Sequence, residues 1–417
     1  MPLRCHPGST LAEARAAARR LLLPLLAFAL LAGAAAQPAE ARVGVIASRT
    51  GSASAAGTAQ WLLASDWARE LQAQGGVFGV PVRLELRDDA SSAPAARAHA
   101  QELVDAGALL LVCCTTPAAS QAVAELAEAA GVPLLAPSAL EPAAPYPYWA
   151  FTLFPDETDA LAAIVADAYR EGRPALALMA LEGPLGDAAS ADLAALLALL
   201  RAGLTHEVRY PPGVQELRPE ALLVASSQPG GVVVWGLADD LTTAYAALRR
   251  RGYEGLVYGR TALLQPGSPA LPWPQLINAR FALPPAAVPS AGGTAPADPY
   301  EPRPGTGGAA GACAAAGRVD AERLARVPGA SANAVATAPF LAALDLAAAG
   351  LEQLIALQIP ASEPPVLRQA LRDAMVGRPA RCTGAGLVDL RDGSVSAIEP
   401  GGLAVGAATR SGLAPLR

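Results

Sequence analysis

Lysine is absent from this 417-residue sequence, so every one of its 31 Lys+Arg residues is arginine. The absence excludes a Walker-type phosphate loop, a Schiff base and a pyridoxal enzyme, all of which need lysine. Histidine is nearly as scarce: beyond the N-terminal segment only His99 and His206 occur, and neither has metal-ligand partners at suitable spacing. A G-x-S-x-G nucleophile elbow is also missing. We therefore expect no metal, no cofactor and no enzymatic activity.

The first 36 residues have the layout of a secretory signal peptide. Arg19 and Arg20 precede an apolar run that starts at Leu21, and small residues end the segment at Ala36. The run is shorter than the roughly 20 residues that span a bilayer, and it contains Pro24. We expect cleavage after Ala36, with an uncleaved anchor or a buried helix as the alternative. Gln37 follows the cut directly, so no cysteine is positioned to carry a lipid, and the mature protein is expected to be periplasmic or secreted.

Long cationic surfaces are not expected in the mature chain. The full sequence has a formal net charge of −6, and the first 36 residues contain four arginines and one glutamate. Their removal makes the balance more acidic still. Nucleic acid is therefore an improbable partner, since binding to phosphates needs clustered positive charge.

The first part of the mature chain alternates apolar strand-like runs with alanine-rich helical stretches, and glycines follow the helices. This rhythm is typical of a parallel sheet wrapped by helices. The expected strands are 43–47, 80–86, 108–113 and 132–135, and the expected helices are 57–74, 94–106 and 118–130. We interpret them as one doubly wound lobe.

A second series of strands and helices begins after Phe154-Pro155, which predicts a second lobe and a hinge between the two. The fold class is thus α/β, with two doubly wound parallel-sheet lobes. Residues 284–317 are rich in proline and glycine and are expected to be a surface loop or insertion. The expected organisation is 1–36 signal peptide, 37–154 lobe 1 completed by about 334–362, and 155–280 lobe 2 completed by about 363–405.

Four stretches of the sequence form an ordered set of motifs. They are Val43-Gly44-Val45-Ile46 with Thr50-Gly51 and Gly57, Gly75-Gly76-Val77-Phe78-Gly79 with Arg87-Asp88-Asp89, Gly131-Val132-Pro133 through Pro137-Ser138-Ala139, and Thr383-Gly384 with Asp389 and Asp392-Gly393. In this order they resemble the landmarks of the type I periplasmic binding proteins of the leucine/isoleucine/valine-binding class. The order and spacing of these stretches make the resemblance more specific than any one of them.

The resemblance implies a Venus-flytrap protein, in which two lobes close around a small molecule. It implies a monomer that delivers its ligand to the permease and ATPase subunits of an ABC-type importer. Closure needs a ligand that binds the closed form better than the open form. Two other functions stay open: a ligand-binding sensor or accessory protein of the same fold, and an exported enzyme.

Open α/β sheets bind ligands beyond the carboxyl ends of their strands, and this places the candidate residues of lobe 1. Thr115 and Thr116 follow a strand and precede a helix, where hydroxyl and backbone N–H groups can hold a carboxylate or simply cap the helix. Ser138 and Ala139 follow the next strand, although Pro137 can also serve only to fix the turn. The resemblance adds two more candidates from the same edge of the lobe, Ser52 and Cys114.

Lobe 2 is expected to contribute Leu185, Leu237, Arg260 and Thr261 from loops after three of its strands. Compared with the amino-acid binders, this chain has Leu185 in place of an aromatic residue, Arg260 or Thr261 in place of an acid, and Leu140 in place of a common threonine. These departures argue against an α-amino acid and favour an anionic or largely apolar organic acid. The expected solute class as a whole is a small polar or acidic molecule, namely an amino acid, an amide or an organic acid. Arg260 suits an anion, and a solvated surface arginine is the alternative.

Four cysteines remain in the mature chain, an even number in an oxidising compartment. We expect a long-range disulfide between Cys313 and Cys382. The neighbouring Cys113 and Cys114 are expected to be buried thiols, with a bridge between them as the alternative.

Overall fold

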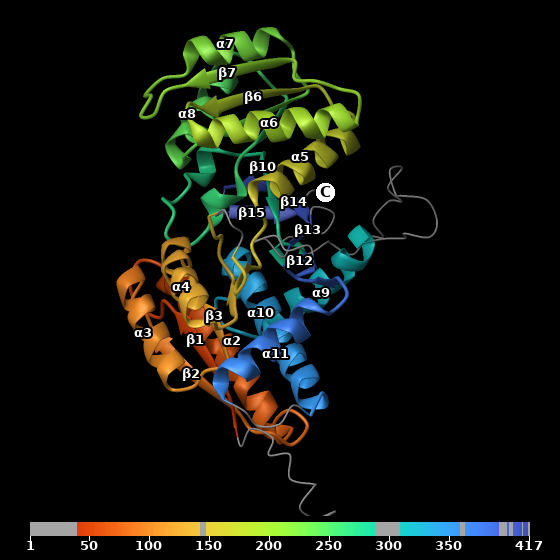
Figure 1. Cartoon of the computed structure of the whole chain (residues 1–417). Coiled ribbons are helices and arrows are strands. Elements are labelled where there is room, and N and C mark those ends of the chain that lie inside the picture. Colours follow the sequence, from red (N-terminus) through yellow and green to blue (C-terminus); the bar gives the residue numbers. More distant parts are fainter. Residues whose placement is uncertain are drawn as a thin grey trace, which may run out of the picture.

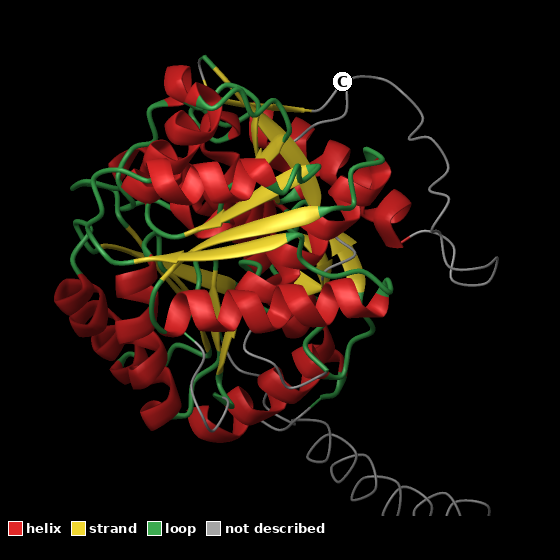
Figure 2. Cartoon of the chain, turned by 90° about the horizontal axis from the view of Figure 1, so that it is seen from above, coloured by secondary structure: helices red, strands yellow, loops and turns green. Residues whose placement is uncertain are grey.

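The computed structural model describes residues 40–141, 147–287, 309–358, 363–391, 398–399, 403–410 and 412–415. It contains two α/β lobes, one above the other in Figure 1, with lobe 1 in orange and blue and lobe 2 in green. Seen from above in Figure 2, the strands lie between layers of helices. The expected two-lobed fold is confirmed. The expected signal peptide, 1–36, lies outside the described residues.

Lobe 1 has a parallel sheet of five strands in the order β2-β1-β3-β4-β5. The central strand β3 is buried along its whole length, because helices cover both faces of the sheet. This explains why it is a continuous apolar run, and not an alternating one. The strands are β1 Ala41–Ala47, β2 Val82–Asp88, β3 Leu110–Cys113, β4 Leu134–Ala136 and β5 Ala150–Thr152.

The helices of lobe 1 form two layers around separate apolar cores. Helices α2 Ser54–Ala73, α10 Ala334–Ala356 and α11 Pro364–Val376 share one core with one face of the sheet. Helices α3 Ala93–Asp105 and α4 Pro117–Ala130 cover the other face. Among the described residues, the helical stretch Ser331–Ala356 is long and apolar enough to cross a membrane, but 83% of its apolar window is buried. It is therefore the core helix of lobe 1.

Lobe 2 has a seven-stranded sheet in the order β15-β14-β10-β9-β8-β6-β7. It is parallel from β7 to β10, and β14 and β15 add an antiparallel edge. Helices α5 and α6 cover one face, and α7 and α8 cover the other. The elements are α5 Glu157–Arg170, β6 Leu176–Leu181, α6 Pro184–Leu199, β7 His206–Tyr210, α7 Arg218–Ser226, β8 Gly231–Trp235, α8 Ala238–Arg250, β9 Leu256–Tyr258, β10 Ala279–Leu283, β14 Ala404–Thr409 and β15 Gly412–Pro415.

A third, small sheet lies beside lobe 1, formed by β11 Arg381–Thr383, β12 Gly386–Val388 and β13 Ile398–Glu399. Helix α9, Ala309–Ala325, packs against it. The structure contains the expected disulfide between Cys313 and Cys382, with Cα atoms 4.6 Å apart. The Gly384 N–H also donates to Asp320 Oδ2 of α9 at 2.6 Å. These contacts fasten the segment that precedes α10 to the C-terminal hairpin.

The C-terminal part of the chain divides between the lobes differently from the expected boundaries. Helix α11 belongs to the core of lobe 1, where Leu367 and Leu371 are buried, although residues 363–405 were assigned to lobe 2. Strand β14 does join the sheet of lobe 2. The end of the expected loop 284–317 is helical, because α9 begins at Ala309, and residues 288–308 lie outside the described part.

Candidate functional site

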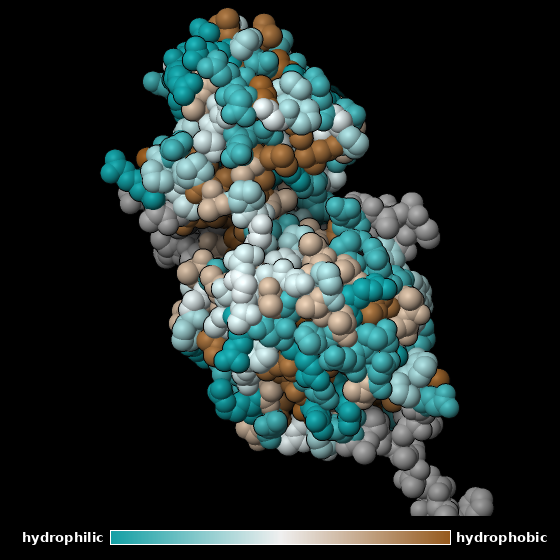
Figure 3. All heavy atoms as spheres, turned by 90° about the vertical axis from the view of Figure 1, so that its left-hand side faces the viewer, coloured by the Kyte–Doolittle hydropathy of each residue, from teal (hydrophilic) through white to brown (hydrophobic). Residues whose placement is uncertain are grey.

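Each sheet has a switch point, where the helices after two neighbouring strands pack on opposite faces and lead in opposite directions along the sheet. In lobe 1 it lies between β1 and β3, since α2 and α4 belong to different cores. In lobe 2 it lies between β6 and β8, which are followed by α6 and α8. Switch points at the carboxyl ends of strands are where open α/β sheets bind ligands. The waist between the two lobes, visible in Figure 3, carries hydrophobic atoms on its surface.

A buried chain of hydrogen bonds crosses the switch point of lobe 1. The Ser48 N–H donates to Thr115 Oγ1 at 2.9 Å, and the same hydroxyl donates to Gln60 Oε1 at 2.6 Å. Gln60 Nε2 in turn donates to the carbonyl of Ala336 in α10 at 3.1 Å. The Thr115 side chain is fully buried and acts as both donor and acceptor inside the lobe. The Thr115 hydroxyl therefore links the loop after β1 to helix α2 at this edge of the sheet.

Close packing supports this network at Gly57 of α2. A Cβ atom at Gly57 would collide with the backbone carbonyl of Ser48, so only glycine lets the helix approach the loop after β1 so closely. The same loop carries Ser52, which is exposed and makes none of the buried bonds.

A second buried network links the loops after β3 and β4. Ser138 Oγ donates to the Cys114 carbonyl at 3.1 Å and lies 2.7 Å from Ser120 Oγ. Ser120 Oγ accepts a bond from the Cys114 N–H at 2.8 Å. Thr116 is the N-cap of α4 and accepts from the Ala119 N–H at 3.4 Å. The capping interpretation of Thr116 is thus realised, and the Ser138 hydroxyl is used within lobe 1.

Cys113 and Cys114 are joined by a disulfide across a cis peptide bond, where the sequence favoured two buried thiols. Both side chains are fully buried between the sheet and α4. The buried cysteines therefore belong to the packing of lobe 1, and the Cys114 backbone supplies the donor and acceptor that Ser120 and Ser138 bind.

Asp88 is the last residue of β2 and Asp89 follows it; both belong to the second sequence motif, which assigns them no role of their own. Ser48 Oγ donates to Asp89 Oδ1 at 2.6 Å, and the Ser91 N–H donates to it at 2.9 Å. Asp89 Oδ2 is buried and has no partner among the described residues. Burial raises the pKa of Asp89 above its usual value, against the opposing effect of these two bonds. Asp89 thus holds a carboxyl group at the edge of the site whose ionised form is disfavoured.

Asp88 has the opposite environment, although it is the next residue. Its partial burial alone would raise the pKa, but bonds from the Ala90 N–H and from Thr50 outweigh burial and lower the pKa of Asp88. Thr50 Oγ1 donates to Asp88 Oδ2 at 2.9 Å. The loops after β1 and β2 are therefore tied together by an ionised carboxylate.

In lobe 2 the guanidinium of Arg260 is held within its own lobe. It donates to both oxygens of Glu157, at 2.6 and 3.2 Å, and to the Gly236 carbonyl at 3.1 Å. Its side chain is only 12% exposed. The suggestion that Arg260 offers a free charge to an anionic solute therefore does not fit, and neither does the alternative of a solvated surface arginine.

The other expected residues of lobe 2 have different environments. Thr261 is buried, and its hydroxyl donates to the Ala282 carbonyl at 2.9 Å. Leu185 is half-buried against the core of α5 and α6. Leu237 is 53% exposed at the start of α8, where its N–H donates to Asp240 Oδ2 at 2.7 Å. Leu237 is thus the exposed apolar residue of this group.

Among the described residues, a hydrogen bond joins the loop after β4 of lobe 1 to the loop after β9 of lobe 2. The Ala139 N–H, after β4, donates to Oε1 of Gln265 in lobe 2 at 2.8 Å. The same loop of lobe 2 places Gly267 against Thr116, because a Cβ at Gly267 would lie 3.4 Å from Thr116 Cγ2. Sequence analysis missed Gln265, since a glutamine in an irregular loop carries no pattern. Ala139 and Thr116, which the sequence predicts as ligand contacts, both lie beside this loop of lobe 2.

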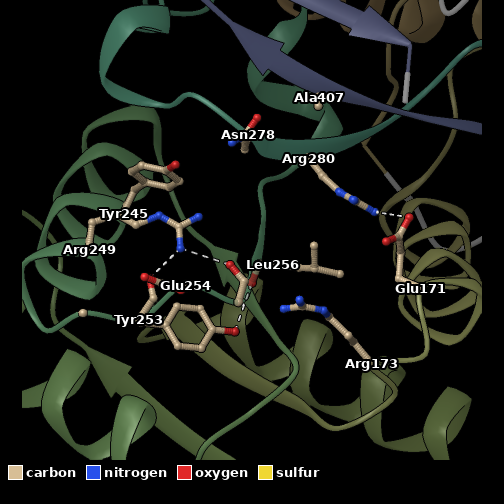
Figure 4. Close-up of a pocket in the computed structure, with 12 residues that line it drawn as sticks. Glu171, Arg173, Tyr245, Arg249, Tyr253, Glu254, Leu256, Asn278, Arg280 and Ala407 are labelled. Atoms are coloured by element: carbon tan, nitrogen blue, oxygen red, sulfur yellow. Dashed lines mark hydrogen bonds and ion pairs between the residues drawn. The ribbon is translucent and has the colours of Figure 1, made fainter. Parts of the chain in front are cut away.

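A cavity of about 560 Å³ lies elsewhere, near the amino ends of β9 and β10 (Figure 4). Arg249 donates to the carbonyls of Tyr253 and Gly255 at 2.6 and 3.1 Å and lies over the Tyr245 ring. Arg280 pairs with Asp167 and Glu171 at 2.7 and 3.2 Å. Two of the arginines that line the cavity are thus engaged in bracing lobe 2, at the edge of the sheet opposite the switch point. Within the described part of the chain, no group of three or more His, Cys, Asp or Glu residues is placed to hold a metal ion.

Replacing Thr115 by valine should destabilise lobe 1 much more than replacing Thr116 by valine. The first change leaves the buried Ser48 N–H and Gln60 Oε1 unpaired, at about 1–3 kcal/mol for each group. The second removes one helix cap, at about 1 kcal/mol. Urea unfolding of the two variants measures the difference, and equal losses in both would contradict the assignment of Thr115 to the buried network.

Asp89→Asn and Asp88→Asn should change the pH dependence of stability in opposite directions. The folded pKa of Asp89 is raised, so the ionised group costs stability at pH 7 and this cost disappears as the pH falls below the unfolded value near 4. Asp89→Asn should therefore be at least as stable as the wild type at pH 7. The folded pKa of Asp88 is lowered, so Asp88→Asn should lose stability at pH 7, and the loss should vanish in acid.

Unfolding free energies of both variants and of the wild type, measured from pH 7 down to about pH 2, test this pair. The assignment fails if Asp89→Asn is the less stable variant at neutral pH.

Known proteins share this architecture. A family model described as periplasmic binding protein matches residues 40–295. None of the curated proteins matches the chain. Among solved structures, a putative branched-chain amino acid ABC transporter from Rhodospirillum rubrum is 20% identical, with a TM-score of 0.62 over 90% of this chain and 100% of that one.

Two further solved structures have named ligands or binding roles. The substrate-binding protein LivJ from Streptococcus pneumoniae, in complex with isoleucine, is 14% identical, with a TM-score of 0.57 over 90% of this chain and 97% of that one. The leucine-binding protein LivK from Thermotoga maritima is 16% identical, with a TM-score of 0.56 over 89% and 97%. At these identities the structures establish the fold, and the family match covers more than half of the sequence. The chain therefore belongs to the periplasmic binding protein family, with the type I fold of two doubly wound lobes.

Proposed function

We propose that the protein captures a small solute outside the cytoplasmic membrane, between the carboxyl ends of its two sheets. The observation that carries this proposal is the contact between Ala139 and Gln265, which joins the loops beyond these strand ends across the two lobes. Each of these loops belongs to the edge of its sheet on which a switch point lies. A solute bound there contacts both lobes and so favours the closed arrangement.

The connections between the lobes suit a hinge. The chain passes from lobe 1 to lobe 2 near Phe154-Pro155, returns after β10, and passes a third time before β14. Short connections of this kind let two rigid lobes rotate with few changes in backbone angles. No bond of the solute needs to be broken in such a cycle.

We further propose that the closed, loaded protein acts as a monomer and delivers its solute to the permease and ATPase subunits of an ABC-type importer. The support is family membership, the export signal expected at residues 1–36, and the names of relatives described as transporter binding proteins. An amino acid, an amide or an organic acid is the proposed solute class.

The hydrogen-bond donors at the carboxyl edge of lobe 1 bear on the class of solute. The hydroxyls of Thr115 and Ser138 are used in buried networks, so the donors proposed for this edge are backbone N–H groups: that of Ala118 in the first turn of α4, and that of Ala139, which Gln265 accepts in this structure. A helix N-terminus favours a negatively charged group through its dipole. The donors of lobe 1 thus suit an acceptor group on the solute.

Thermal shift of the purified mature protein tests the capture of a solute. The screen contains branched-chain and other amino acids, short-chain and aromatic carboxylates, and the matching amides. A true solute at 100 times its dissociation constant should stabilise the protein by about 2.7 kcal/mol. The proposal fails if no compound shifts the melting temperature and mass spectrometry of gently purified protein finds no retained small molecule.

A further inference from the structure

The loop after β9 is a rigid support for the side chain of Gln265. The short helix Thr261–Leu264 opens the loop, with Thr261 anchored to the Ala282 carbonyl of β10. The Ser268 N–H donates to the Gln265 carbonyl at 3.1 Å, and Ser268 Oγ donates to the Ala262 carbonyl at 3.3 Å. The loop is thus closed on itself by its own polar groups, and it presents Gln265 to lobe 1.

The amide oxygen of Gln265 accepts a hydrogen bond from one of the donors of the proposed solute site, the Ala139 N–H. It accepts the Ala139 N–H at 2.8 Å, and the whole Gln265 residue is only 5% exposed. The contact is therefore shielded from water on the side of lobe 2. Two residues further along the same loop, Gly267 lies against Thr116 of lobe 1. The neutral amide of Gln265 thus occupies the position that an acceptor atom of a solute would take to bond to the Ala139 N–H.

The strengths of the two kinds of acceptor are unequal. A hydrogen bond between neutral groups shifts an equilibrium by only about two- to tenfold, because water competes for both partners. A bond to an ionised carboxylate is roughly twice as strong. A solute with a carboxylate therefore displaces the Gln265 amide from Ala139, whereas a solute with an amide gains nothing over it.

On this basis we propose that Gln265 is a specificity-determining residue that competes with the solute for the Ala139 N–H. Without solute, its amide holds the two lobes together. A carboxylate-bearing solute replaces it, and neutral amides are rejected. The inference rests on the proposed capture of a solute between the lobes and narrows the solute class to carboxylates.

Hydrogen exchange of the Ala139 amide tests the contact without any solute. In Gln265→Ala the acceptor is lost, so exchange at Ala139 should be about two- to tenfold faster than in the wild type. Gln265→Glu keeps an acceptor oxygen at pH 7 and should preserve the protection. Gln215→Ala is the matched control, because Gln215 bonds only to the Gly213 carbonyl of its own loop among the described residues. The proposal is overturned if folded Gln265→Ala protects Ala139 as well as the wild type does.

Calorimetric titration with isovalerate, acetate, isovaleramide and acetamide tests the competition. The wild type should bind a carboxylate and reject the matching amide. Gln265→Ala should bind the carboxylate about two- to tenfold more tightly and begin to bind the amide, because the competitor is gone. Equal binding of acid and amide by the wild type overturns the proposal, and so does weaker carboxylate binding in Gln265→Ala, which would make Gln265 a solute contact.

The two experiments also separate this proposal from the function on which it rests. If none of the four probes binds to any variant, the carboxylate solute class is wrong. Accelerated exchange at Ala139 in Gln265→Ala would still show that Gln265 holds the lobes together.

Discussion

The bond from the Ser48 N–H to Thr115 Oγ1 spans the point where β1 and β3 separate, and the site depends on it. At a switch point the helices that follow the two strands leave to opposite faces, so no crossover covers the strand ends. Backbone groups there must find other partners or stay exposed to a ligand. Lobe 1 solves this with a buried network through Gln60 to α10. This network fixes the loops after β1 and β3, which in turn position the start of α4.

The need to satisfy backbone groups at the strand ends determines which side chains and which backbone groups can face a ligand. The hydroxyl groups of Thr115 and Ser138, which the sequence predicts as ligand contacts, are hydrogen-bonded inside the lobe. Ala139, which has no polar side chain, provides the donor that faces lobe 2. Lobe 2 is built in the same way, with the positive charge of Arg260 neutralised by Glu157. Under the proposed function, the choice of solute rests on a small number of groups, among them Gln265.

Much of the fold was predictable because local sequence patterns indicate its strands and helices. Apolar runs such as that of β3 and glycines after helices indicate alternating strands and helices, and the order of the motifs gave the two-lobed class. The short strand β5 and the antiparallel strand β14 lack such patterns, since pairing with distant strands forms them. Helix α11 was placed in the wrong lobe because its amphipathic pattern shows that it packs, but not against which core.

The candidate site was predictable only as a location. The sequence places Thr115, Thr116 and Ser138 after strands, and the structure confirms that they lie at the carboxyl edge. Whether a hydroxyl faces a ligand or a neighbouring side chain depends on tertiary contacts, such as those of Gln60 and Ser120, which no local pattern specifies. The partner of Arg260 is likewise 103 residues away in sequence.

The central claim is that the solute binds between the carboxyl edges of the two lobes, and a crystal structure of the protein purified with its natural solute tests it most directly. The account predicts solute density beside the Ala139 N–H, between the start of α4 and the loop that contains Gln265. Density in the cavity lined by Arg249 and Arg280, with the Ala139 bond to Gln265 left in place, would contradict it.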